Sequence, residues 1–343
     1  MKKLYLVLFA FIVLISCKSE DKKDEKVSEL TVYTHRHYES DQKLFEQFEK
    51  ESNIKLNIVN ASADELIQKM SLEGEQSPAD VLITVDAGRL YRAKYQDLLQ
   101  PFSSDLIDSI VPAHLKDEDG HWVGLTKRAR VIAYSKENVD STQLSTYEDL
   151  TSDNWNDDIL VRSSSNIYNQ SLLASIIANK GQEFAEEWAK GIVENMARSP
   201  KGNDRDQVKG VANGIGNLAI VNTYYIGKLL NSEDESEVAA GKAVNIFFPN
   251  QETTGTHINV SGIGVTKYSP NKENAIKFIE FLLKEGAQEI FAGSNYEYPV
   301  NPNVEPSEIL KEWGDFKEDK LSLNELGKYN KEAVIIFDKV GWK

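Results

Sequence analysis

A single cysteine, Cys17, is present among the 343 residues of this sequence. A lone thiol near the start of the chain, with none in the remainder, does not suit a structural or a catalytic role. The sequence also lacks a Gly-x-Ser-x-Gly nucleophile elbow, and no third zinc ligand stands at a recognisable spacing from His35 and His37. A zinc-dependent envelope hydrolase that uses these two histidines is therefore a remote alternative, and we expect no enzymatic activity.

An excess of basic residues is also missing. The chain has 39 lysines and arginines against 54 aspartates and glutamates, and its net charge is −15. This balance argues against a nucleic acid partner, because no basic excess exists to neutralise phosphates. An acidic chain favours a cationic ligand weakly, through its long-range electric field.

No apolar run is long enough to cross a bilayer comfortably. The longest, residues 4–15, follows Lys2 and Lys3 and precedes the motif Leu-Ile-Ser-Cys, a pattern typical of a secretory signal. The motif resembles a bacterial lipobox, so we expect residues 1–16 to be removed and Cys17 to be lipidated. The alternative is an ordinary signal peptide with a chance cysteine.

The segment after the cysteine is almost entirely polar and charged. With little to bury, residues 17–29 predict a disordered tether between the lipid and the folded body. We therefore expect the protein in the cell envelope, periplasmic or extracytoplasmic, and attached to a membrane by its lipid.

The body of the chain alternates apolar strands with amphipathic helices, which predicts an α/β fold with parallel strands joined by crossovers. The predicted strands are residues 30–34, 54–59, 79–85, 158–162 and 218–221. The length suits two lobes, each a mostly parallel sheet flanked by helices. We expect the chain to cross between them twice, near residues 130–135 and 259–265. Lobe 1 would comprise residues 30–128 and about 259–300, and lobe 2 residues 129–258 and about 301–343.

Unusual polar side chains follow four of these strands. In an open α/β sheet, ligands bind outside the carboxyl ends of the strands, so these positions form the candidate site. Three of the four strand ends deliver a tyrosine within a few residues, and they belong to both expected lobes. They could therefore converge across one cleft. The side chains concerned are His35, His37, Tyr38, Asp86, Tyr168, Tyr224 and Tyr225.

The chemistry of phenols restricts what a cluster of tyrosines can bind. Ionising one phenol at pH 7 costs roughly 4 kcal/mol, and four cost roughly 16 kcal/mol, because the unperturbed pKa is about 10. A sugar or an amino acid would need only neutral phenols, whereas a trivalent Lewis acid can drive their ionisation. Calcium and magnesium sites use carboxylates and carbonyls, and zinc sites prefer cysteine and histidine. Tyrosine-rich ligation thus indicates ferric iron.

The adjacent pair Tyr224 and Tyr225 lies where a strand gives way to a helix. Neighbouring residues of a strand point to opposite faces, so both phenols can face one ion only if the strand has ended. The helix N-terminus that follows would favour negative charge on them. Ordinary packing is the alternative reading of any single tyrosine here, because tyrosine is a good strand residue.

Two arginines in the segment "GLTKRARVIAYS" complete the candidate set. Arg128 and Arg130 project to one side of an extended chain. Four phenolates around a +3 ion leave about one negative charge, which an arginine could offset while lowering the pKa of the tyrosines. Alternatively, it could hold a small anion such as carbonate that completes the coordination. A surface run of charge is the plain alternative.

Taken together, these stretches resemble the ferric-iron-binding extracytoplasmic solute-binding proteins of ABC importers, in particular the cyanobacterial-type branch. The matching motifs are "YTHRHYESD", "LITVDAG", "GLTKRARVIAYS", "RSSSNIYNQS", "GNDRDQ", "AIVNTYY" and "NYEYPVNP", in this order from about residue 30 to 305. The resemblance implies a two-lobed, transferrin-like periplasmic-binding-protein fold of the class II type.

The resemblance also implies a ligand set. The metal ligands would fall on Tyr38, Tyr168, Tyr224 and Tyr225, with His37 as a candidate fifth, and Arg128 would lie nearby. His35 departs from the family pattern, in which many relatives carry a small polar residue, and leaves the coordination number open.

The function that follows is capture of ferric iron by a monomer that closes around the ion and delivers it to an ABC permease in the inner membrane. An oxyanion or polyamine carrier of the same fold is the alternative. It would use Arg128, Asp86 and the serines of residues 163–165, with tyrosines as walls.

Overall fold

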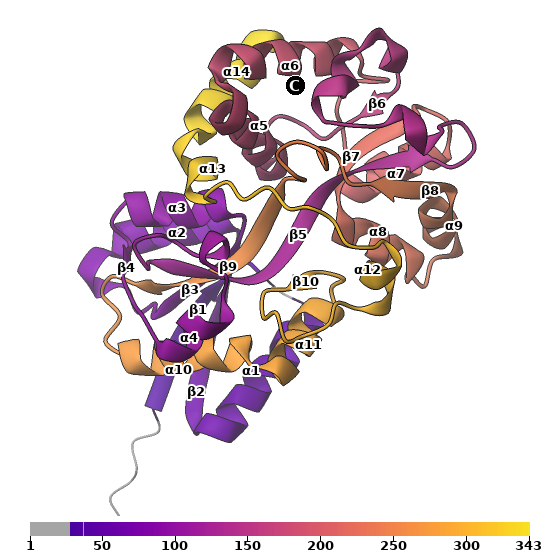
Figure 1. Cartoon of the computed structure of the whole chain (residues 1–343). Coiled ribbons are helices and arrows are strands. Elements are labelled where there is room, and N and C mark those ends of the chain that lie inside the picture. The colour runs from indigo at the N-terminus through magenta and orange to yellow at the C-terminus, as the bar shows by residue number, and fades with distance from the viewer. Residues whose placement is uncertain (1–27, 37) are drawn as a thin grey trace, which may run out of the picture.

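The computed structural model describes residues 28–36 and 38–343. Within them the chain alternates strands and helices, as the sequence predicts for an α/β fold (Figure 1). The strands are β1 Ser28–Thr34, β2 Ile54–Asn60, β3 Val81–Val85, β4 Leu99–Gln100, β5 Trp122–Ser135, β6 Ile159–Leu160, β7 Leu218–Asn222, β8 Val244–Phe247, β9 Ile258–Thr266 and β10 Tyr298–Pro299.

The helices flank these strands, and none in the described part of the chain is long and apolar enough to cross a membrane. They are α1 Glu39–Ser52, α2 Ala63–Glu73, α3 Ala87–Tyr95, α4 Asp105–Ile110, α5 Ile167–Lys180, α6 Gln182–Glu194, α7 Asp204–Ala212, α8 Thr223–Leu230, α9 Glu235–Ala243, α10 Lys272–Leu283, α11 Glu285–Gly293, α12 Glu308–Glu312, α13 Asn324–Lys328 and α14 Asn330–Val340.

One long strand, β5, belongs to both halves of the sheet. The strand order is β2-β1-β3-β9-β5-β7-β6, with β4 on β9 and both β8 and β10 on β5. Residues up to Ala129 of β5 pair with β9, whereas residues from Arg130 onward pair with β7 and β8. In Figure 1, β5 runs from a lower group of helices around β1–β3 to an upper group around β7. The division of the remaining segments into two lobes stays a prediction.

The expectation of mostly parallel sheets is wrong in its detail. Among the described residues, β1 pairs in parallel with β2 and β3, and β6 pairs in parallel with β7. The other six ladders are antiparallel, and all of them involve β5 or β9. These two strands carry the chain back through the middle of the sheet instead of following a helical crossover, so they enter against their neighbours.

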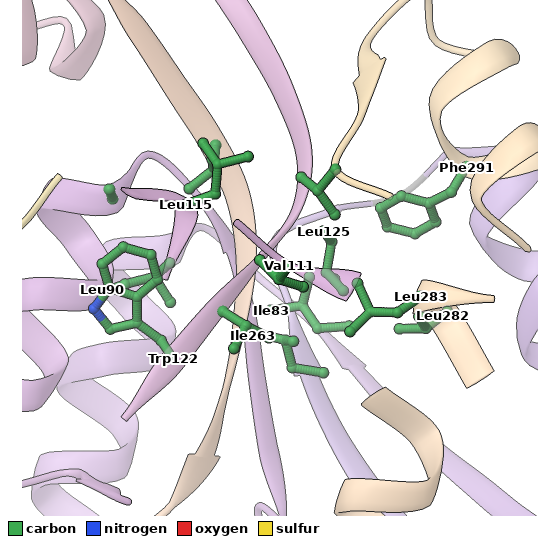
Figure 2. Close-up of a cluster of buried hydrophobic side chains, with 14 of the residues drawn as sticks. Ile83, Leu90, Val111, Leu115, Trp122, Leu125, Ile263, Leu282, Leu283 and Phe291 are labelled. Carbon is green, nitrogen blue, oxygen red and sulfur yellow. The ribbon is translucent and has the colours of Figure 1, made fainter. Parts of the chain in front are cut away.

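The largest core runs through both groups of helices, and most of its residues lie in the lower one. Its central strand β3 is buried on both faces, because α2 and α3 cover one side and α1, α4 and α10 the other, and Val81, Leu82 and Ile83 are fully buried. The apolar spacing of α10 turns Phe278 into the sheet, where its ring meets Phe48 edge to face at 4.9 Å. Figure 2 shows the part of this core around Trp122, Ile263 and Leu282.

The C-terminal segment joins the two halves at a second place. The short helix α13 packs against α3 of the lower group and α5 of the upper group, and α14 continues along α5 and α6. The approach of α13 to α3 is close enough to require a glycine, because a Cβ atom on Gly327 would overlap the side chain of Tyr91.

This contact gives a test of the fold. Replacement of Gly327 by alanine should lower the free energy of unfolding by about 1–3 kcal/mol, since the added carbon must push α13 away from α3. The matched control is Gly286→Ala in α11, where an added Cβ has nothing within 4 Å and stability should hold or rise slightly. Urea unfolding measures both, and equal stability of the two variants would contradict the packing described.

Candidate metal-binding site

The four candidate tyrosines all stand at the starts of helices. Tyr38 is the residue that immediately precedes α1, Tyr168 is the second residue of α5, and Tyr224 and Tyr225 are the second and third residues of α8. The predicted change from strand to helix is confirmed, since β7 ends at Asn222 and α8 begins one residue later. Unpaired N–H groups and the helix dipole make such starts favourable for negative charge.

The phenols from these helix starts converge. Tyr224 Oη donates a hydrogen bond to Tyr168 Oη at 3.2 Å, and the rings of Tyr224 and Tyr225 lie 4.2 Å apart between centroids. Tyr38 lies close enough that its charge would raise the pKa of Tyr224. The strand has ended before Tyr224, so the two neighbouring phenols are not held on opposite faces of a sheet.

The pKa of three of these phenols, those of Tyr38, Tyr224 and Tyr225, is raised above its ordinary value, which favours the protonated form at neutral pH. Burial, with the nearby Glu297 carboxylate, raises the pKa of Tyr38 to about 12. Burial likewise raises the pKa of Tyr224 and of Tyr225, and each would be raised further by charge on Tyr168. The surroundings therefore oppose ionisation, and only a cation placed among the oxygens would reverse the preference.

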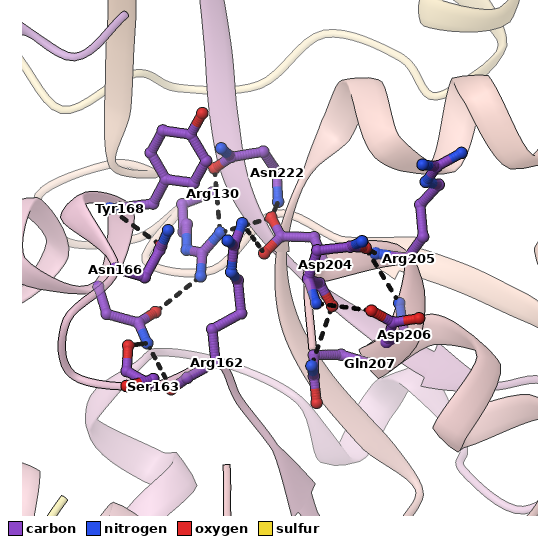
Figure 3. Close-up of polar contacts among 12 residues, drawn as sticks. Arg130, Arg162, Ser163, Asn166, Tyr168, Asp204, Arg205, Asp206, Gln207 and Asn222 are labelled. Atoms are coloured by element: carbon purple, nitrogen blue, oxygen red, sulfur yellow. Dashed lines mark hydrogen bonds and ion pairs between the residues drawn. The ribbon is translucent and has the colours of Figure 1, made fainter. Parts of the chain in front are cut away.

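Three arginines surround Tyr168, with the carbon of each guanidinium 5.7–6.0 Å from the ring centroid: Arg128, Arg130 and Arg162. The nearby Asp204 and Tyr225 raise the pKa of Arg162, although burial opposes the shift. Figure 3 shows Arg130 and Arg162 approaching Asp204 from the same side, with Tyr168 beside Arg130.

Arg130 and Arg128 differ in how their hydrogen-bonding groups are used. Arg130 donates to Asp204 at 2.8 Å and to Asn169 at 2.7 Å, so its charge is matched by a buried carboxylate. Arg128 is 1% exposed and donates to Ser261 Oγ at 3.3 Å, but its Nε and Nη2 have no partner in the described part of the chain. Arg128 is therefore the guanidinium left to meet an anion.

Asp86, which was expected to act around the site or toward an anion, is held by hydrogen bonds from three segments. Its buried carboxylate accepts hydrogen bonds from Gly88 N, Ser171 Oγ and Asn259 Nδ2, each at 2.8 Å. Burial raises its pKa, and the charge of Arg128 opposes that shift. Asp86 thus caps α3 and ties it to β9 and α5, and these bonds fill its capacity as an acceptor.

Of the predicted residues His35, His37 and Cys17, the structure describes only His35. His35 is half-buried at the end of β1, and its backbone N–H donates to the Ile83 carbonyl at 3.1 Å. His37 and Cys17 lie outside the described residues, as do the expected signal peptide and most of the tether. The roles assigned to them stay predictions.

Another cluster of metal-ligating side chains lies elsewhere. Within residues 28–36 and 38–343, the histidines, cysteines and carboxylates that come close enough to share an ion are Asp117, Asp119 and His121. Both carboxylates already accept from Lys94 Nζ, at 2.8 and 2.6 Å. This cluster does not include His35, so it lends nothing to a zinc site there.

Sequence reasoning missed several charged groups around the phenols. Lys228 Nζ lies 4.0 Å from the centre of the Tyr38 ring and 5.5 Å from that of Tyr224. Burial lowers the pKa of Lys228 to about 8, although Glu297 partly opposes the shift. The spacing of four residues from Tyr224 to Lys228 on a helix could have revealed this neighbour. The contacts of Glu297, which is distant in sequence, carried no such signal.

Comparisons with known proteins agree with this geometry. The profile of the bacterial extracellular solute-binding protein family matches residues 76–316. Iron uptake protein A1 of Synechocystis sp. is 48% identical over 315 residues, covering 92% of this chain and 88% of that protein. A Trichodesmium protein solved in complex with iron and citrate ligands superposes with a TM-score of 0.90 at 47% identity, over 92% of this chain and 100% of that one.

A second solved structure gives the same result. The ferric binding protein from Campylobacter jejuni has a TM-score of 0.87 at 46% identity, with 92% of this chain and 100% of that one covered. The predicted resemblance to ferric-iron-binding proteins and the expected binding-protein fold are confirmed. The chain therefore belongs to the bacterial extracellular solute-binding protein family.

Proposed function

We propose that this protein captures ferric iron outside the cytoplasmic membrane and delivers it to an ABC permease. The observation that carries the proposal is the meeting of phenols from three helix starts, with 3.2 Å between the oxygens of Tyr168 and Tyr224. In the proposed site Tyr38, Tyr168, Tyr224 and Tyr225 bind the ion as phenolates, and His37 is a candidate fifth ligand. Further support comes from the relatives, which are named for iron uptake and ferric ion binding.

The energetics favour a trivalent ion. With a pKa of about 12, ionising Tyr38 alone at pH 7 costs about 7 kcal/mol. Fe³⁺ leaves one negative charge beside four phenolates, whereas a divalent ion would leave two in the same buried place. Phenolate is a hard oxygen donor, which suits hard ions such as Fe³⁺.

Arg128 gives the site room for an anion. Its two unpartnered nitrogens would donate to a carbonate or a small carboxylate that completes the coordination of the ion. The Trichodesmium relative was solved with iron and citrate together. A synergistic anion is thus part of the proposal.

Capture would follow from closure of two lobes on the ion. Tyr38 follows β1 of the lower group, and the other three tyrosines follow β6 and β7 of the upper group, so hinge closure assembles the ligand set and excludes water. The closed monomer, anchored by a lipid on Cys17, would dock on the permease and release iron when the lobes part. It makes and breaks no bond in its ligand and is no enzyme.

An oxyanion carrier is the second candidate, and Arg128 is the observation in its favour. Two free guanidinium nitrogens suit an oxyanion without any metal. Polyamine binding has weaker support, because the cleft is lined by arginines. A colourless protein whose melting temperature rises with phosphate, but not with ferric citrate, would favour the oxyanion carrier.

Proton release is the first test of phenolate ligation. Because the phenols are protonated without metal, binding of Fe³⁺ should release three to four protons, and the affinity should fall by about three to four orders of magnitude for each pH unit of acidification. Potentiometric titration of the metal-free protein with a ferric salt measures the release. Binding without proton release would refute the ligand set.

Colour is the second test. The iron-loaded protein should be red to orange through phenolate-to-iron charge transfer. Tyr168→Phe and Tyr224→Phe should each weaken the band and lower iron affinity by more than the roughly 10–100-fold that loss of an outer-shell partner costs. The control is Tyr95→Phe, an 80% exposed phenol on α3, which should change neither. A band of undiminished intensity in both Tyr168→Phe and Tyr224→Phe would exclude these two tyrosines as ligands.

A further inference from the structure

Lys228 bridges tyrosines from the two halves of the molecule. It lies on α8, one helical turn after Tyr224, and its ammonium lies over the rings of Tyr38 and Tyr224 at 4.0 and 5.5 Å from their centres. Tyr38 comes from the β1–α1 junction, on the other side of β5 and β9 in the sheet. One cation therefore contacts a candidate ligand from each half.

No carboxylate pairs with this ammonium. Within residues 28–36 and 38–343, Lys228 makes no ion pair and no hydrogen bond, its ammonium lies over the two rings, and the charges of Glu297 and Asp41 act on it from a greater distance. The nearby carboxylates, Asp41 and Glu297, each bond to Arg36 at 3.0 Å. An ammonium buried without a counterion is costly, so a residue of this kind needs a reason beyond folding.

Three other cations near the phenols bond directly to carboxylates. Arg36 bonds to both Asp41 and Glu297, and Asp204 pairs with Arg130 at 2.8 Å and with Arg162 at 3.5 Å. Lys228 differs from these arginines in its position, because its ammonium lies over the rings of Tyr38 and Tyr224 without a bonded carboxylate among the described residues. The phenolates of an iron-loaded site are the counterions that its position suits.

We propose that Lys228 is a specificity-determining residue of the iron site, which stabilises the ionised forms of Tyr38 and Tyr224 and raises the reduction potential of the bound iron. This inference rests on the proposed function. A ferric site with four phenolates has a net charge of −1, and the ferrous form has −2. A fixed positive charge beside them stabilises both forms, and the ferrous form more. The same residue thus increases affinity for Fe³⁺ and makes the bound ion easier to reduce.

The test replaces Lys228 by methionine in the full chain and retains the charge in a second variant, Lys228→Arg. The control is Lys190→Met, which removes a lysine that lies 4.0 Å from Glu194 on the exposed side of α6. Three quantities are measured for each: the free energy of unfolding without metal, the citrate concentration that removes half of the iron, and the reduction potential of the bound iron by spectroelectrochemistry.

Lys228→Met is expected to act in opposite directions on the metal-free and on the iron-loaded protein. Lys228→Met should leave the metal-free protein as stable as the original or more stable, because a buried unpaired charge is gone. It should lower the citrate midpoint roughly tenfold, as loss of a unit charge at this range implies, and make the potential more negative. Lys228→Arg and Lys190→Met should keep the potential close to that of the original chain.

The outcomes separate the two proposals. If the unaltered protein holds no iron, the proposed function fails. If it binds iron and Lys228→Met keeps the same citrate midpoint and potential, the inference about Lys228 fails alone. If Lys228→Met loses stability without metal while the potential is unchanged, the lysine is structural and the inference is overturned.

Discussion

Phenols and positive charges lie together in one buried place, and their charge balance is the constraint on which the rest of the site depends. Burial keeps the pKa of Tyr38 and Tyr224 high, so the oxygens hold their protons. Among the described residues at the same place, Arg128 keeps two nitrogens without hydrogen-bond partners, and Lys228 bonds to no carboxylate. Buried phenolates and buried cations are each unfavourable alone. A trivalent ion that ionises the phenols provides the cations with negative charges, so the two kinds of group then stabilise each other.

Three contacts join the lower and the upper group of helices and so hold the residues of the site together. β5 continues without a break from its pairing with β9 to its pairing with β7, and Arg128 and Arg130 lie at the change of partner. Asp86 adds a second tie between α3, β9 and α5, and α13 adds a third between α3 and α5. Three separate contacts thus set how far the helix start that bears Tyr168 can move from the half that bears Tyr38.

Much of the fold could be predicted from the sequence, and the failures have physical causes. The periodicity of apolar residues located β1, β2, β3 and β7 and the main helices, because burial imposes spacing on each element separately. The direction of pairing was not predicted for β5 and β9, since an apolar strand carries no mark of whether its neighbour runs with or against it. Asp86 was expected near the site because it follows a strand, but its bonds to Ser171 and Asn259 could not be predicted, since both donors are far from it in the chain.

For the site, the sequence by itself determined the chemistry: which strand ends carry phenols, and that several phenols together require a strongly charged cation. Only the tertiary structure decided which charges are matched. Arg128 and Arg130 are two residues apart and identical in type, but one bonds to Asp204 and the other has free nitrogens. That difference depends on partners from distant segments. The position of a residue in a strand determines which way its side chain points, but not which charged group lies there.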